Sequence, residues 1–118
     1  MVKNTSQISM TRGDTAKFHF HRIDNDGHII TTRPDKLYFS VKNKPQNYSV
    51  IFQKTIDDME FDAEYEWHFT IEPTDTNMMT FPSNYCYDVE VIDDGVKTTI
   101  AYGDFVLLPE VTHYNNEV

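Results

Sequence analysis

Apolar and polar residues alternate along most of this chain, which is typical of β-strands that bury one face and leave the other in water. In the segment 82–100, alternate positions carry aromatic or branched side chains: Tyr85, Tyr87, Val89 and Val91. The pair Asp94-Gly95 follows, and a second alternating arm begins at Val96. An Asp-Gly pair between two such arms is a strong signal of a tight β-turn. The segment is therefore predicted to form a β-hairpin.

The same alternation predicts further strands at residues 6–10, 16–23, 28–32, 37–42, 48–55, 64–72 and 105–108. Residues predicted to face inward include Phe18, Phe39, Tyr65 and Trp67. The connections contain Gly, Pro, Asn and Asp, which favour turns, as at residues 11–15 around Gly13.

Four segments are less regular. Residues 56–63 fit either a short edge strand or a single helical turn. Residues 73–77 fit one helical turn, with Thr74 or Asp75 as its N-cap. Residues 102–104 are predicted to form a kink before the last strand, and the tail from 113 to 118 is expected to fray.

Many short strands with turns between them, and no clear amphipathic helix, predict an all-β fold. We expect an antiparallel immunoglobulin-like β-sandwich of about 7–9 strands, with a jelly roll or small barrel as the alternative. Phe81, Tyr85 and Tyr87 at the entrance of a strand resemble the tyrosine corner of such sandwiches. Residues 1–118 are expected to form a single domain, with an ordered core from about 6 to 112.

Composition supports a compact core and excludes some partners. The chain has 118 residues, 14% of them aromatic, and a net charge of −9. Such an acidic surface repels phosphate backbones, so nucleic-acid binding is not expected. No apolar run approaches the roughly 20 residues of a spanning helix, so we expect no membrane insertion. The N-terminus lacks the apolar region of a signal peptide, and Cys86 is the single cysteine, so we expect synthesis in a reducing cytoplasm.

Three histidines form the best candidate for a metal site. His19 and His21 share one strand face, and His68 falls on another strand that could lie beside it. Imidazole nitrogens suit zinc or nickel. These positions are also the solvated faces of strands whose opposite faces are apolar, and that interpretation is favoured. We therefore predict no metal ligand, cofactor-binding residue or cofactor.

The remaining candidates have structural explanations. The segment 24–27 superficially resembles the start of a calcium loop, but it lacks the later ligands and flanking helices, so a turn is favoured. An acidic run is expected to form a solvated rim: Asp57, Asp58, Glu60, Asp62, Glu64 and Glu66. Arg12-Gly13-Asp14 fits a turn, and Cys86 fits a partly buried, unreactive thiol. No nucleophilic triad or glycine-rich phosphate loop occurs, so the chain is expected to be non-enzymatic, with no catalytic residue.

The order of several motifs resembles that of a known group. They are MTRGDT at 10–15, VIFQKT at 50–55, IEPTDT at 71–76, NYCYDVEV at 84–91, TTI at 98–100, GDF at 103–105 and PEVT at 109–112. This order is similar to small immunoglobulin-like structural proteins of phages and prophages of Gram-positive gut bacteria. Some members of that group are described as similar to the N-terminal domain of baseplate upper proteins.

The resemblance implies a virion structural protein: a tail, baseplate, neck or head-attached module that is assembled in the bacterial host cytoplasm. Its partners would be other virion subunits, with a homo-oligomer as one possibility. The alternative is a carbohydrate- or receptor-binding module that stacks its ligand on an exposed aromatic side chain. The candidates for that platform are Tyr38, Tyr48, Trp67 and Tyr114. Trp67 alternates with charged residues and is expected in the core instead.

Overall fold

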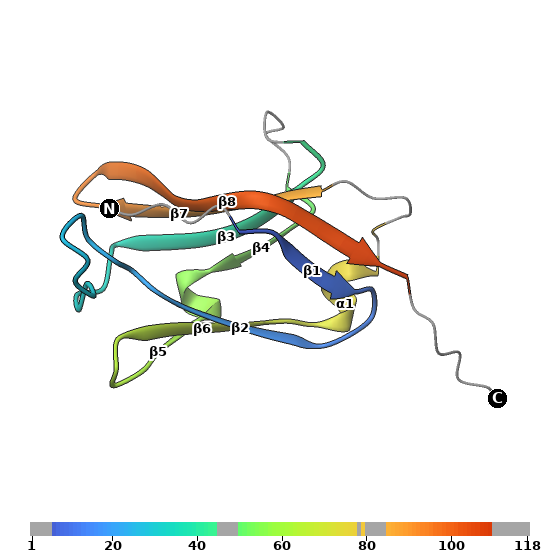
Figure 1. Ribbon diagram of the computed structural model, residues 1–118, viewed down its shortest axis with the longest axis horizontal. Helices are drawn as coiled ribbons and strands as arrows, with labels where there is room; N and C mark the ends of the chain where they lie inside the picture. Colours follow the sequence, from blue (N-terminus) through green and yellow to red (C-terminus); the bar gives the residue numbers. More distant parts are fainter. Residues whose placement is uncertain (1–5, 45–49, 78, 80–84, 110–118) are drawn as a thin grey trace.

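Two β-sheets are stacked face to face in the computed structural model, which describes residues 6–44, 50–77, 79 and 85–109 (Figure 1). The first sheet has the strand order β1 (Ile8–Thr11), β8 (Val96–Leu108), β7 (Tyr85–Asp93), β3 (Lys36–Lys42) and β4 (Phe52–Thr55). The second sheet has the order β2 (Ala16–His21), β6 (Glu66–Ile71) and β5 (Glu60–Phe61). The described residues therefore contain eight strands.

The connectivity is that of an immunoglobulin-like sandwich. In chain order, the second, fifth and sixth strands form one sheet, while the third, fourth, seventh and eighth strands lie together in the other. Variable-type immunoglobulin domains divide their strands between sheets in this way. The predicted fold class is confirmed. All strand pairs of the described residues are antiparallel except β1 with β8, which run parallel from Ile8 opposite Phe105 to Thr11 opposite Leu108.

Aromatic side chains fill the space between the sheets. Phe39 of β3 is 1% exposed, and its ring centroid lies 4.7 Å from that of Phe69 on β6. On its own sheet it stacks against Tyr87 at 5.8 Å. Trp67 is completely buried, as predicted, and stacks on Phe61 at 4.4 Å. Alternation along β3, β6 and β7 thus predicted the core correctly.

The predicted hairpin joins β7 to β8. Asp93 pairs with Val96, so Asp94 and Gly95 are the two loop residues. Their φ angles are 52° and 78°, and a positive φ at both positions is typical of a type I′ turn. The Asp94 N–H also donates a hydrogen bond of 2.9 Å to the Asp35 carboxylate. The Asp-Gly signal was therefore correct for both the turn and the pairing of the strands.

The predicted kink at residues 102–104 is wrong, because β8 is one continuous strand of 13 residues (Figure 1). Its irregularity lies earlier, where Val89 pairs with Ala101 but Glu90 pairs with Thr99. Ile100 is the extra residue of this β-bulge, and it shifts the alternation by one position. The shift allows Ile100 and Phe105, which are an odd number of residues apart, both to be buried in the core.

Residues 28–32 do not form the predicted strand, since the only pairing described there is a single bridge between Ile23 and Ile29. The ambiguous segment 56–63 contains both predicted structures, a 3₁₀ turn η1 (Ile56–Asp58) followed by β5. Tyr65 does not enter the core. It lies in the turn before β6 with φ 64°, and it is 42% exposed.

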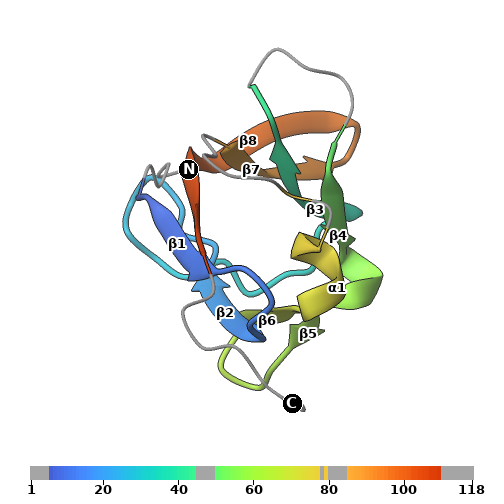
Figure 2. The same ribbon diagram turned by 90° about the vertical axis from the view of Figure 1, so that its right-hand side faces the viewer.

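The helical turn after β6 is α1 (Pro73–Thr76), which lies beside β4 and β6 (Figure 2). Its N-cap is Glu72, and neither Thr74 nor Asp75 holds that position. Asp75 instead accepts a hydrogen bond of 2.7 Å from the Glu72 N–H through its carboxylate. None of the helices in the described ranges is long and apolar enough to cross a membrane.

The Arg12-Gly13-Asp14 turn packs against α1, as expected of a structural turn. The Arg12 guanidinium donates to the Asn77 carbonyl at 2.7 Å, and the Gly13 N–H donates to the Thr76 hydroxyl at 3.1 Å. Gly13 has φ 86°, which explains the choice of glycine. Expectations for Tyr48, Phe81 and the tail 113–118 fall outside the described residues.

We predict that Phe39→Ala will lower the free energy of unfolding by about 3–5 kcal/mol, because it removes a buried ring that contacts both sheets. Chemical denaturation followed by tryptophan fluorescence would measure this loss. The control is Val96→Ala, since Val96 is 64% exposed and should change stability by less than about 0.5 kcal/mol. Equal effects of the two substitutions would contradict the central position of Phe39.

Candidate functional site

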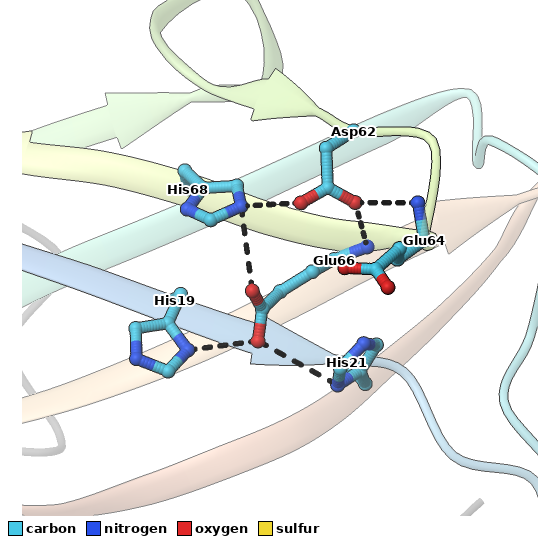
Figure 3. Close-up of polar contacts among 6 residues, drawn as sticks. All are labelled: His19, His21, Asp62, Glu64, Glu66 and His68. Carbon is cyan, nitrogen blue, oxygen red and sulfur yellow. Dashed lines mark hydrogen bonds and ion pairs between the residues drawn. The ribbon is translucent and has the colours of Figure 1, made fainter.

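The outer face of the three-stranded sheet carries a cluster of imidazole and carboxylate groups (Figure 3). We call it the histidine–carboxylate cluster; its members are His19, His21, Asp62, Glu66 and His68. Strands β2 and β6 are antiparallel neighbours, with His19 opposite His68 and His21 opposite Glu66. The four polar side chains therefore share one face of the sheet.

Glu66 is the centre of the cluster (Figure 3). Its Oε2 atom lies 2.8 Å from His19 Nδ1 and 3.8 Å from His21 Nδ1. Its Oε1 atom lies 3.4 Å from His68 Nε2. One carboxylate thus contacts three imidazole rings from two strands, and 22% of its side-chain surface remains exposed.

A tight turn brings Asp62 to the same place. Asp62 Oδ1 accepts hydrogen bonds from the N–H groups of Glu64 at 2.8 Å and Glu66 at 3.0 Å. The turn closes through the Tyr65 N–H, which donates to the Asp62 carbonyl at 3.1 Å, and it requires the positive φ of Tyr65. The other carboxylate oxygen, Oδ2, is left to face His68 Nε2 at 2.7 Å.

These contacts shift the pKa values of Asp62 and His68. The hydrogen bond to His68, helped by the two backbone N–H groups, lowers the pKa of Asp62 to about 2. The same hydrogen bond raises the pKa of His68 above its usual value of 6.5. Both groups therefore favour the charged forms at mildly acidic pH.

The cluster is accessible from solvent. The side chains of His68 and Asp62 are 39% and 37% exposed, and that of His19 is 66% exposed. A surface cavity of about 540 Å³ opens beside them, and its lining includes Lys17, His19, Glu60 and His68. A small ion or water can therefore reach the imidazole and carboxylate groups of the cluster without unfolding the sheet.

The prediction that His19, His21 and His68 lie on solvated strand faces agrees with their exposure. The three side chains also lie together, as the candidate metal site required. Sequence reasoning favoured the solvated faces over that site. It missed the role of Asp62 and Glu66, which were assigned to a solvated acidic rim. The alternation that puts Glu66 and His68 on one face was a usable signal, whereas the turn that carries Asp62 depends on an unusual backbone angle.

Two other acidic candidates, Asp24 and Asp58, have local structural roles. Asp24 Oδ1 accepts hydrogen bonds from the N–H groups of Asp26 and His28, each at 2.9 Å. These bonds form a turn, which confirms the prediction for residues 24–27. Asp58 accepts a hydrogen bond from the Thr55 N–H at 2.8 Å.

Cys86 is partly buried, and its thiol donates to the Lys42 carbonyl at 3.6 Å. Burial raises its pKa, which disfavours the reactive thiolate. Among the proposed stacking platforms, Trp67 is inaccessible in the core and Tyr38 is partly buried. Tyr48 and Tyr114 lie outside the described residues.

Comparisons with known proteins found similar chains among solved structures. No family model matches the sequence, and no curated protein matches it. Among solved structures, a chain described as "Marsupial T cell receptor" is similar, with 10% sequence identity and a TM-score of 0.48. The match covers 92% of this chain and 51% of the receptor chain, so this chain spans about half the length of the receptor chain.

We predict that Asp62→Asn will lower the pKa of His68 toward 6.5, because the ion-pair partner that raises it is removed. An NMR titration of the His68 ring protons in chelator-treated buffer would measure the change. The control is Asp26→Asn, which removes a carboxylate from a separate loop and should leave the pKa of His68 as in the wild type. An unchanged His68 pKa would contradict the Asp62–His68 contact.

The sign of the pH effect on stability follows from the two shifts. The depressed pKa of Asp62 contributes stability that is present above about pH 3.8 and is lost as the pH falls through about 2. The raised pKa of His68 contributes stability that is present below 6.5 and is lost as pH rises through the raised value. The wild-type protein should therefore exceed Asp62→Asn in melting temperature most clearly between those limits, near pH 5.

Proposed function

We propose that this protein is a non-enzymatic structural component of a bacteriophage or prophage virion, in a tail, baseplate, neck or head-attached module. It acts through contacts with other virion subunits, and a homo-oligomer is one form of that contact. The proposal combines the order of sequence motifs with a sandwich that leaves strand edges open to other chains. The observation that carries it in the structure is the outer edge of β1.

Strand β1 has one neighbour, β8, among the described residues. The Arg12 N–H donates to the Leu108 carbonyl at 2.8 Å. In a parallel pair, alternate residues direct their backbone groups to the same side, so Ile8 and Met10 also face β8. Ser9, between them, directs its N–H and carbonyl toward the free edge. An extended segment of another subunit could pair there by strand addition.

The β4 edge of the same sheet differs from the β1 edge. The Asp58 carboxylate accepts the Thr55 N–H, and the turn η1 follows directly. A carboxylate that accepts a hydrogen bond from an edge N–H competes with an incoming strand. Natural sheets use such features to limit unwanted pairing. The β1 edge is thus the better candidate for a subunit contact in this sheet.

The surface charge fits an assembly role. A net charge of −9 favours solubility before assembly and repels the subunit from packaged DNA. Large exposed apolar side chains occur along β8 at Val96, Tyr102 and Leu108, with exposed fractions of 64%, 48% and 46%. They are spaced along the strand and do not gather in one hydrophobic patch, which favours contacts made partly through the backbone.

We predict that particles purified from the phage or prophage that encodes this chain will bind a gold-labelled antibody raised against it. Negative-stain electron microscopy would show label at one defined position of the particle. Absence of label from every intact particle, with the protein present in the lysate, would contradict a virion role.

We further predict that Ser9→Pro in the phage genome will strongly reduce the labelled fraction of particles, because proline removes the N–H that faces the free edge. Ser9→Ala is the matched control, since it removes the hydroxyl but keeps that N–H. Melting curves of both purified variants would establish that each one folds. Equal incorporation of the two variants would exclude the β1 edge as the contact, while the labelling experiment tests the virion role independently.

A further inference from the structure

We propose that Asp62, Glu66 and His68 bind one divalent transition-metal ion of the Zn²⁺ class, with a fourth coordination position open to water. This site is independent of the proposed virion role. Three properties of the ligand atoms on the outer face of the three-stranded sheet support it: their kind, their spacing and their orientation.

The ligand atoms have the chemistry that zinc selects. The site offers one imidazole nitrogen, His68 Nε2, and two carboxylate oxygens from Asp62 and Glu66. Nitrogen from histidine and oxygen from carboxylates are common zinc ligands, and open zinc sites use three protein ligands plus water. Calcium and magnesium prefer all-oxygen ligand sets, so the imidazole favours a transition metal over them.

The spacing is close to what a tetrahedral ion needs. The three ligand atoms all lie within 4.8 Å of one another. Two ligands about 2.0–2.1 Å from a tetrahedral zinc lie about 3.3 Å apart, and His68 Nε2 is 3.4 Å from Glu66 Oε1. His68 Nε2 and Asp62 Oδ2 are at the hydrogen-bond distance of 2.7 Å and need to separate slightly. Binding replaces the proton between these two atoms with the metal and releases that proton to solvent.

Neighbouring groups already orient two of the three ligands (Figure 3). The N–H groups of Glu64 and Glu66 hold Asp62 Oδ1, so that Oδ2 points to His68. His19 contacts Glu66 Oε2 at 2.8 Å and so turns Oε1 toward His68. Such outer contacts orient metal ligands and usually change affinity by about 10–100-fold when removed. The arrangement therefore resembles a metal site whose ligands are already held in position by hydrogen bonds from neighbouring groups.

The site can accept water. The three ligand residues are each partly exposed, and the adjoining cavity has His68 in its lining. An ion held there would retain an open coordination position and a route of entry. The second group of possible ligands, Asp24, Asp26 and His28, is less favourable, because Asp26 and His28 are exposed and His28 Nδ1 lies 4.0 Å from Asp24 Oδ2.

The test is isothermal titration calorimetry of the full chain with ZnCl₂ after treatment with a chelator. We expect one Zn²⁺ per chain, with affinity reduced at least about tenfold in His68→Gln and in Glu66→Gln. His28→Gln is the matched control, because it removes an exposed histidine near two aspartates outside this site; it should bind as the wild type does. Circular dichroism of each variant would show that the fold is retained.

Cobalt provides a second readout that does not depend on the heat of binding. Co²⁺ bound through nitrogen and oxygen in a tetrahedral site gives intense visible absorption bands, which Zn²⁺ should abolish by displacement. We expect those bands in the wild type and in His28→Gln, but not in His68→Gln. The absence of saturable binding would overturn the proposal, leaving the cluster as an ion-pair network. Binding that survives His68→Gln, or that is lost in His28→Gln, would also overturn it.

Discussion

Phe39 lies between the two sheets, with its ring 4.7 Å from Phe69 of the opposite sheet and 5.8 Å from Tyr87 of its own. This aromatic contact is the constraint on which the architecture depends, because each sheet has one apolar face that is stable only when covered. A two-residue strand such as β5 or a parallel edge such as β1 adds little cohesion alone. Both are held in place because their neighbours pack into this common core.

The same constraint positions the candidate site. Phe69 and Trp67 face the core from β6, so His68 between them must face outward, and the period of two then places Glu66 beside it. On β2 the inward Phe18 and Phe20 likewise turn His19 outward. A slip of one residue between the strand and its core would reverse every one of these orientations. The histidine–carboxylate cluster is therefore a consequence of the packing on the opposite face.

Alternation alone was sufficient to predict the sheet faces of β3, β6 and β7, and the Asp94-Gly95 pair was sufficient to predict the hairpin between β7 and β8. It was insufficient where the backbone leaves regular geometry. The bulge at Ile100 lets residues of opposite parity share one face, which a strict period of two does not anticipate. Alternation predicts that Tyr65 faces inward from a strand. Instead, Tyr65 adopts a positive φ in the turn that brings Asp62 to His68. Sequence reasoning therefore found the histidines but not the complete cluster.

Charge alone does not explain why this location, among many acidic ones, should prefer a metal. With a net charge of −9, most of the surface attracts cations weakly and without selectivity. The cluster differs because its carboxylates are held by backbone N–H groups and by His19, so their oxygens are oriented before any ion arrives. Its strands belong to the three-stranded sheet, whereas the free edge of β1 belongs to the five-stranded sheet. The proposed metal site and the proposed subunit contact can therefore be altered separately, by substitutions that leave the shared aromatic core intact.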